Sequence, residues 1–153
     1  MTSPVAVILG SKSDLKYWED SKKYLDYFDI KADVQILSAH RTPEDVAVFA
    51  SGARKNGYRL IIAAAGMAAH LAGAIAAHSD LPVLGVPLPG GIFDGVDALL
   101  STVQMPAGVP VATFAVGTAG FRNACVFAAQ ILSLEEPAYK KKLKDFKHQG
   151  SRL

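Results

Sequence analysis

Three short polar segments of this 153-residue chain carry the side chains whose types and spacing could do chemistry. Each segment directly follows an apolar run, and the candidate residues are Ser11, Ser13 and Asp14, then Ser38, His40 and Arg41, then Gly66, Ala68 and His70. Hydroxyls and backbone N–H groups in a turn that opens a helix can hold a phosphate. An imidazole beside a guanidinium places a proton-transfer group next to an anion-binding group. These residue types predict a site for a small anionic substrate that gains and loses a proton.

Each of these patterns also has an interpretation without function. Ser13 or Asp14 can serve only to cap a helix, and a histidine–arginine pair is common on protein surfaces. His70, between alanines at a predicted helix start, is by itself more typical of a core residue or a helix cap. His78, near the end of the same helix, is expected to interact with the helix dipole. The functional interpretation therefore depends on whether the three segments meet.

Several common kinds of site find no support in the sequence. Residues 10–14 match neither the Walker A pattern nor Gly-x-Gly-x-x-Gly, which disfavours nucleoside triphosphates and dinucleotides. The absence of a Gly-x-Ser-x-Gly sequence disfavours a hydrolase of that type. No His-x-x-x-His pair or cysteine cluster is present, so we expect no protein-bound metal.

The elements that must position these residues follow from short apolar runs that alternate with longer helical segments. Strands are predicted at residues 5–9, 34–37, 60–65, 83–86 and 111–116. Helices are predicted at about residues 14–28, 43–55, 68–77, 96–103, 121–132 and 137–147. Continuously apolar strands are typical of a parallel sheet with helices on both faces. The pattern predicts an α/β, three-layer, flavodoxin-like, doubly wound parallel sheet of five strands with an extra C-terminal helix.

In such a sheet, ligands bind at the carboxyl ends of the strands, near the point where the strand order reverses. If the first three strands lie in the order 2-1-3, the polar segments are neighbours and form one pocket. Residues 87–95, rich in proline and glycine, are expected to form a mobile loop over it. Thr42 is the predicted N-cap of the helix that begins at Pro43, and Gly57 its C-cap glycine.

The composition predicts one folded domain, residues 1–153, with its core in residues 5–134 and a basic C-terminal helix in 135–153. Half of the residues (50%) are hydrophobic and 20% are charged, which is too apolar for disorder. No apolar run is long enough to span a membrane, and residues 1–9 lack the basic start of a signal peptide. The single cysteine, Cys125, is expected in the core and is compatible with a reducing cytoplasm.

Charge and hydrophobicity also bear on the partners. The net charge is +2, but residues 135–153 hold six Lys and Arg against three Asp and Glu, so the remainder is slightly acidic. A short lysine-rich helix is typically a solvated face, and we expect no nucleic-acid partner. The alanine-rich run 63–77 and the segment 121–132 hold much of the apolar excess. One small domain has limited interior for it, which predicts a homo-oligomer.

Five ordered motifs carry a family resemblance. They are Gly-Ser-Lys-Ser-Asp (10–14), Ser-Ala-His-Arg-Thr-Pro (38–43), Ala-Ala-His-Leu (68–71), Pro-Val-Leu-Gly-Val-Pro (82–87) and Val-Gln-Met-Pro (103–106). Over about residues 5–134 the chain resembles the catalytic-subunit family of phosphoribosylaminoimidazole carboxylase, in its mutase group. Arg41 and the retained Ala-Ala-His-Leu favour the mutase group over a sister group that often carries Lys after the first His. Met67 and Ala72 depart from the family pattern, which often has Gly and Pro there.

The resemblance implies a substrate of the aminoimidazole ribonucleotide type and a role for each candidate residue. Asp14 would hold the ribose hydroxyls, and Ser11, Ser13 and Arg41 the phosphate. His40 would be the general acid/base, and His70 would line the pocket around the imidazole and the carboxylate. The remaining predicted substrate-binding residues are Ser38, Gly66 and Ala68.

The implied reaction converts N5-carboxyaminoimidazole ribonucleotide to the 4-carboxy isomer in de novo purine (IMP) biosynthesis, by decarboxylation and recarboxylation. The resemblance implies no cofactor. It also implies that the expected oligomer is a cytoplasmic homo-octamer with pockets near subunit boundaries. Two alternatives remain open at this point. One is direct carboxylation of aminoimidazole ribonucleotide with CO2, and the other is a nucleotide-sensing module without catalysis.

Overall fold

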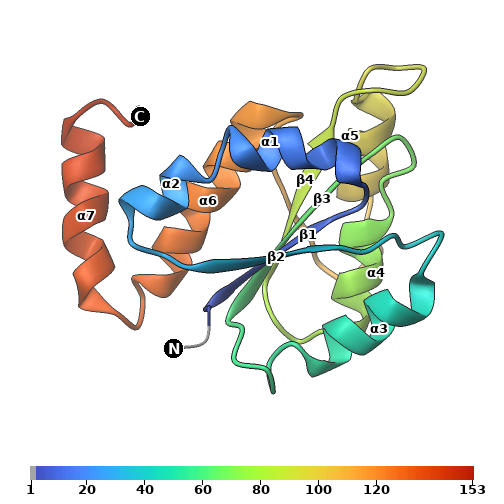
Figure 1. Ribbon diagram of the computed structural model, residues 1–153, viewed down its shortest axis with the longest axis horizontal. Helices are drawn as coiled ribbons and strands as arrows, with labels where there is room; N and C mark the ends of the chain where they lie inside the picture. Colours follow the sequence, from blue (N-terminus) through green and yellow to red (C-terminus); the bar gives the residue numbers. More distant parts are fainter. Residues whose placement is uncertain (1–2) are drawn as a thin grey trace.

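A five-stranded, all-parallel sheet forms the centre of the computed structural model, which describes residues 3–153 (Figure 1). Met1 and Thr2, which begin the segment where no signal peptide is expected, lie outside the described residues. The strands are β1 (Val5–Leu9), β2 (Ala32–Ile36), β3 (Leu60–Gly66), β4 (Val83–Leu88) and β5 (Ala112–Thr113). Their order across the sheet is β2-β1-β3-β4-β5. The predicted fold class is confirmed.

The strand register brings the three polar turns to one level. Leu9, the last residue of β1, lies opposite Ile36 at the end of β2 and opposite Ala64 near the end of β3. The chain moves from β1 to β2 in one direction and then returns past β1 to β3, so the order reverses between β1 and β3. The segments that follow these three strands therefore start side by side at the reversal point, where ligands bind in sheets of this kind.

Helices cover both faces of the sheet, and each face has its own core (Figure 1). On one face, Val7 packs with α1 (Leu15–Glu19), α2 (Lys23–Tyr27) and α6 (Thr118–Leu132), and α7 (Pro137–His148) packs outside α6. On the other face, Ile8 packs with α3 (Pro43–Gly52) and α4 (Leu71–His78), while α5 (Val96–Val103) packs on β4. Side chains at alternate positions of β1 thus face opposite layers, as the pleat requires.

Several predicted boundaries are wrong. The helix expected over 14–28 is instead a 3-10 turn, η1 (Lys12–Asp14), followed by α1 and α2, with a break at residues 20–22. Asp20 and Ser21 stand at this break, and both types compete with helical hydrogen bonding. The helix expected from residue 68 begins at Leu71, because tight turns occupy residues 67–70.

The remaining boundary differences lie at element ends. Strand β5 covers two residues rather than 111–116, at the edge of the sheet. Strand β2 covers 32–36 rather than 34–37, and β4 extends to Leu88, so the loop expected over 87–95 begins at Pro89. Helix α3 ends at residue 52 rather than 55, and α6 begins at 118 rather than 121. Gly57 has the left-handed φ of 91° expected of a C-cap glycine, but it follows the turn after α3 rather than the helix itself.

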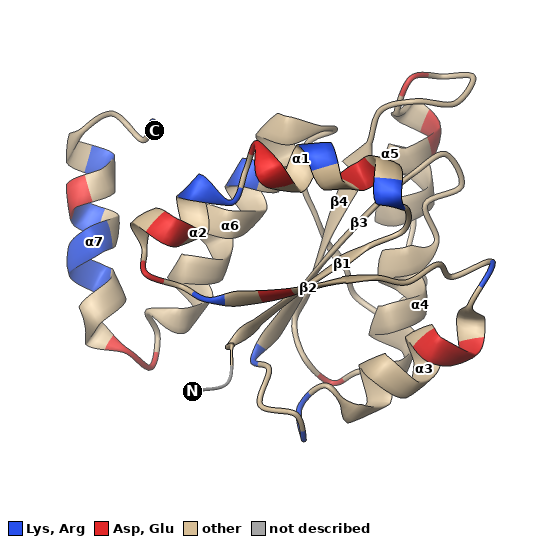
Figure 2. Cartoon of the chain, in the orientation of Figure 1, with Lys and Arg blue, Asp and Glu red and all other residues tan. Residues whose placement is uncertain are grey.

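Two further observations bear on the predictions from composition. Cys125 is fully buried in α6, and burial raises the pKa of its thiol to about 12, so the predicted core position is confirmed. No helix in residues 3–153 is long and apolar enough to cross a membrane. The lysines of α7, which colour much of that helix blue in Figure 2, are exposed except for the half-buried Lys142.

Candidate active site

A cleft of about 840 Å³ opens at the carboxyl ends of β1, β2 and β3. The loop after β4 closes one side of it through Pro89, Gly90 and Gly91. All nine predicted site residues line this cleft: Ser11, Ser13, Asp14, Ser38, His40, Arg41, Gly66, Ala68 and His70. The structure therefore brings together every residue that the sequence singled out, although those residues lie up to 59 positions apart, from Ser11 to His70.

The first wall of the cleft is the turn that leads into η1. Ser11 is the N-cap of η1, and its side chain accepts hydrogen bonds from the Ser13 backbone N–H (3.3 Å) and the Ser13 hydroxyl (3.0 Å). Gly10 lets this turn lie against β3, since an added Cβ would come within 3.3 Å of the Cβ of Ala65. Two exposed hydroxyls thus stand together at the start of a helical segment, a geometry suited to phosphate oxygens.

Asp14 lies at the back of this wall and is nearly buried, with 9% of its surface exposed. Burial raises the pKa of its carboxyl group, and hydrogen bonds from Ser11 and Ser13 oppose the rise. It occupies the N-cap position of α1 but makes no capping hydrogen bond with its side chain. Its closest side-chain partner is the Ser13 hydroxyl, at 3.4 Å. Helix capping therefore does not account for this carboxylate, which is available to the hydroxyls of a ligand.

The second wall is the turn after β2, which Ser38 and Thr42 hold together. The Thr42 hydroxyl donates to the Ser38 carbonyl (3.2 Å) and accepts from the Ser38 N–H (3.1 Å). The Ser38 hydroxyl accepts the Arg41 backbone N–H at 3.2 Å. Thr42 stands at the predicted N-cap of α3 but makes no side-chain cap bond. The turn presents the exposed guanidinium of Arg41 to the cleft, and no side chain among residues 3–153 forms an ion pair with it.

His40 and His70 face each other across the cleft. Nε2 of His40 lies 2.7 Å from Nδ1 of His70, and the rings meet edge to face with centroids 4.9 Å apart. Since a hydrogen bond needs one donor and one acceptor, one of these nitrogens carries the shared proton. His70 is exposed and makes no side-chain cap bond at α4, so neither the core nor the cap interpretation explains it. A pair of imidazoles that shares a proton can donate a proton to a bound molecule and accept one from it.

The third wall consists of small residues and one larger exception. Ala65, Gly66 and Ala68 line the cleft, and a Cβ at Gly66 would come within 3.3 Å of the Leu88 carbonyl oxygen. Between Gly66 and Ala68, Met67 adopts a left-handed φ of 55° and is 63% exposed. Reasoning from sequence did not select Met67 as a site residue.

Lys12 is a second residue of the cleft that sequence reasoning missed. It is exposed and lies between the two serines of the first wall. Its position in the motif of residues 10–14 was the available indication.

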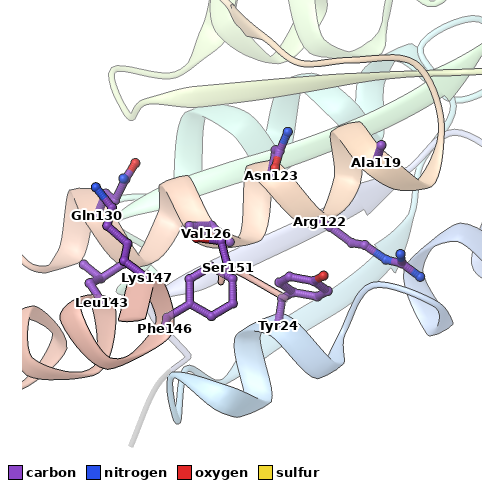
Figure 3. A pocket seen from close by; sticks show the side chains of 10 residues that line it. All are labelled: Tyr24, Ala119, Arg122, Asn123, Val126, Gln130, Leu143, Phe146, Lys147 and Ser151. Carbon is purple, nitrogen blue, oxygen red and sulfur yellow. The ribbon is translucent and has the colours of Figure 1, made fainter. Parts of the chain in front are cut away.

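A second hollow, of about 370 Å³, lies between α2, α6 and α7 (Figure 3). Tyr24 and Phe146 pack edge to face at its base, with ring centroids 6.0 Å apart. Arg122 spans one side, where it donates to the Asp20 carbonyl oxygen (3.3 Å) and lies over the Tyr24 ring. No histidine, cysteine or carboxylate lines this hollow. Its titratable lining residues are Tyr24, Arg122 and Lys147, and it has no counterpart of the histidine pair in the cleft.

Comparison with known proteins gives concordant matches. A family model described as AIR carboxylase matches residues 4–152. The N5-carboxyaminoimidazole ribonucleotide mutase of Haemophilus influenzae is 46% identical over 152 residues, which cover 99% of this chain and 93% of the relative. The mutase of Pseudomonas aeruginosa is 49% identical over 147 residues, with 96% and 90% covered. The crystal structure of Treponema denticola PurE aligns with a TM-score of 0.86 and 27% identity, covering 96% of this chain and 90% of that one.

Proposed function

Since the chain belongs to the AIR carboxylase family, we propose that it is an isomerase that converts N5-carboxyaminoimidazole ribonucleotide to 4-carboxy-5-aminoimidazole ribonucleotide. This reaction is a step of purine biosynthesis. The observation that carries the proposal is the pair of histidines, joined at 2.7 Å, in one cleft with two hydroxyls and with an arginine that has no ion-pair partner among residues 3–153. Proton transfer and phosphate binding are what this isomerisation needs.

The substrate's phosphate and ribose have matching groups in the cleft. The hydroxyls of Ser11 and Ser13 and the guanidinium of Arg41 bind the phosphate, because charge-assisted hydrogen bonds from a planar guanidinium suit phosphate oxygens. The Asp14 carboxylate accepts hydrogen bonds from the ribose hydroxyls. Ser38 holds the backbone of Arg41 in place, and Gly66 and Ala68 leave room for the imidazole ring.

His40 moves the proton in both halves of the reaction. It donates a proton to the exocyclic nitrogen as the N–C bond of the carbamate breaks, which yields the amine and CO2. C4 of the ring then forms the new bond to this CO2, and His40 removes the C4 proton to restore the aromatic ring. The proton given in the first half is recovered in the second, so the isomerisation balances without ATP, a metal or another cofactor.

His70 is the second histidine of the proposed catalytic pair. Its Nδ1 lies at hydrogen-bond distance from Nε2 of His40, so the tautomers of the two rings are coupled: one of these two nitrogens donates and the other accepts. The remainder of its ring lines the part of the cleft where the imidazole and the carboxylate of the substrate lie. A well-placed acid/base of this kind contributes about 10² to 10⁴-fold to the rate.

The proposed enzyme is a cytoplasmic homo-octamer of single catalytic domains, with residues 5–134 as the core of each domain and 135–153 as a basic addition. Support for assembly comes from α5, where Val96, Leu100 and Val103 form an exposed apolar stripe at the spacing of one helix face. Phe93, in the loop just before α5, extends it and is 63% exposed. Light scattering at micromolar concentration should give eight subunits, and a monomer would contradict this part of the proposal.

Neither alternative function is favoured by the comparisons. Relatives at 46% and 49% identity are named as mutases, which supports neither direct carboxylation nor a module without catalysis. Purified protein should convert N5-carboxyaminoimidazole ribonucleotide to the C4 carboxylate in the absence of ATP. Substantial label in the first product formed from labelled bicarbonate would instead indicate a carboxylase that uses CO2. Tight nucleotide binding with no turnover would indicate the sensing module.

A further inference from the structure

Met67 adopts a backbone conformation that its residue type rarely takes. Four residues of the described chain other than glycine have a left-handed φ, namely Asp29, Met67, Asp94 and Ser151. Short polar side chains, aspartate above all, are the types that tolerate this region, because they bond locally to the backbone. A methionine gains nothing comparable there. Strain of this kind persists at sites where the surrounding structure requires it.

The turn that presents His70 requires the conformation but not the side chain. The Ala69 N–H donates to the Met67 carbonyl (2.9 Å), and the His70 N–H donates to the Ala68 carbonyl (2.8 Å). Gly66, just before the turn, pairs with Leu88 of β4, which fixes where the turn starts. A glycine at position 67 would fulfil the backbone requirement without strain. The methionine side chain itself therefore needs an explanation.

Packing within the subunit does not supply one. Met67 is 63% exposed, so its thioether chain contributes little to either core. It lines the cleft next to Gly91 of the loop after β4, where an added Cβ would come within 3.4 Å of the Met67 Cγ. The side chain thus lies at the mouth of the cleft, between the turn that carries His70 and the loop. The same loop exposes Ile92 (88%) and Phe93 (63%).

We propose that Met67 is an apolar cover that keeps CO2 in the cleft between the two halves of the reaction. This inference rests on the proposed mutase function, in which CO2 exists free of covalent bonds after the N–C bond breaks and before the bond to C4 forms. CO2 is small and uncharged, so no ion pair or strong hydrogen bond can hold it, and only exclusion of an exit path retains it. A flexible, unbranched apolar side chain at the open mouth suits this task, because it can adapt to the loop that faces it.

Retention of CO2 can be measured directly by isotope tracing. The substrate is labelled with ¹³C at the carbamate carbon, and the reaction runs without ATP in excess unlabelled bicarbonate with carbonic anhydrase. Mass spectrometry then gives the labelled fraction of the C4 carboxylate product. Wild-type protein should retain most of the label. Met67→Gly should lose label about tenfold faster, the size of effect expected when one apolar contact is removed.

Stability separates this role from a structural one. Because Met67→Gly relieves a left-handed backbone, it should raise Tm by about 2–4 °C while label retention falls. Ser151→Gly relieves the same conformation far from the cleft (φ of 57°) and should raise Tm without changing retention. Met67→Leu restores apolar bulk and should restore retention, whereas Met67→Ala, which keeps the strain but removes the thioether, should leak like the glycine variant.

The results of these experiments test the role of Met67 separately from the proposed mutase function. Label retention at the wild-type level in both Met67→Gly and Met67→Ala would overturn the role of Met67. Wild-type protein that forms no C4 carboxylate at all would overturn the proposed mutase function itself.

Discussion

The cleft at the strand ends and the hollow between α2, α6 and α7 differ in how their polar groups are used. In the cleft, the guanidinium of Arg41 has no ion-pair partner within residues 3–153, and Asp14 is nearly buried with the Ser13 hydroxyl, at 3.4 Å, as its side-chain partner. In the hollow, Arg122 donates to a backbone carbonyl and lies over the ring of Tyr24. The charged groups of the cleft are available to a ligand, whereas the arginine of the hollow already serves the fold.

The backbone of the two regions also differs in degree, although the left-handed Ser151 lines the hollow. Left-handed residues surround the cleft at Met67, Gly90 and Gly91, and close backbone approaches at Gly10 and Gly66 bring its walls together. The hollow is bounded mainly by regular helices, with Phe146 packed against three aromatic rings. The hollow also has a lysine at its edge, Lys147, and a left-handed residue, Ser151, so the features that separate the two regions are the histidine pair and the nearly buried carboxylate of Asp14, which only the cleft contains among the described residues.

The largest expected effect is from the histidine pair. His40→Asn keeps a hydrogen-bonding group near His70 but cannot transfer a proton, so kcat should fall by about 10² to 10⁴-fold. Steady-state kinetics measures the loss, and calorimetric titration with the product should show that binding is retained. Unchanged turnover would remove His40 from the mechanism.

Two matched arginine variants test the comparison itself. Arg41→Met removes the proposed charged hydrogen bonds to the phosphate and should lower kcat/KM by about 10- to 100-fold. Arg122→Met, in the hollow, should leave kcat/KM unchanged and lower Tm slightly, because it loses only contacts to Asp20 and Tyr24. Equal losses of activity in both variants would show that the cleft and the hollow do not differ in function as described.

A smaller effect is expected from substitution of Asp14, which should raise the stability of the protein but lower its activity. Burial raises the pKa of this carboxyl, so the native state favours its protonated form. The stabilisation that the protonated Asp14 carboxyl provides is fully present at pH values below its pKa in the unfolded state. It is lost as the pH rises through the raised pKa of the native state. Asp14→Asn should therefore be more stable than wild type at neutral pH, with the gain vanishing in acid, while KM rises about tenfold. Thermal unfolding across pH 3–8 (a range around the ordinary carboxyl pKa, about 3.9) and kinetics at neutral pH measure the two effects.

The smallest expected effect concerns the cysteine of α6. Cys125 is fully buried and its thiol pKa is raised to about 12, so almost no thiolate forms at neutral pH. Native protein should resist iodoacetamide and keep full activity, and modification should appear only after unfolding. Rapid alkylation of the folded protein with loss of activity would place a reactive group outside the cleft.

Much of the fold followed from local patterns. Continuous apolar runs at residues 5–9 and 60–65 predicted buried parallel strands, and the strand-end position of the polar segments predicted that they meet. Prediction failed where features other than hydrophobic periodicity end an element. The break at Asp20 and Ser21 and the shortening of β5 at the sheet edge have no clear periodic signature.

The site was predicted in its residues but not in its geometry. The spacing along the chain cannot reveal that His40 and His70, thirty residues apart, lie within hydrogen-bond distance, because that depends on two separate turns. The position of Met67 likewise depends on two separate segments, because the turn before α4 holds its backbone and Gly91 of the loop after β4 lies next to its side chain. Residue types pointed to the chemistry, while the turns set the distances.

A crystal structure with the product 4-carboxy-5-aminoimidazole ribonucleotide bound would test the central claim most directly. We expect the product in the cleft, with its phosphate on Ser11, Ser13 and Arg41 and its imidazole ring beside His40. Product bound in the hollow between α2, α6 and α7, or bound with its phosphate away from Arg41, would rule out the cleft as the active site proposed for this enzyme.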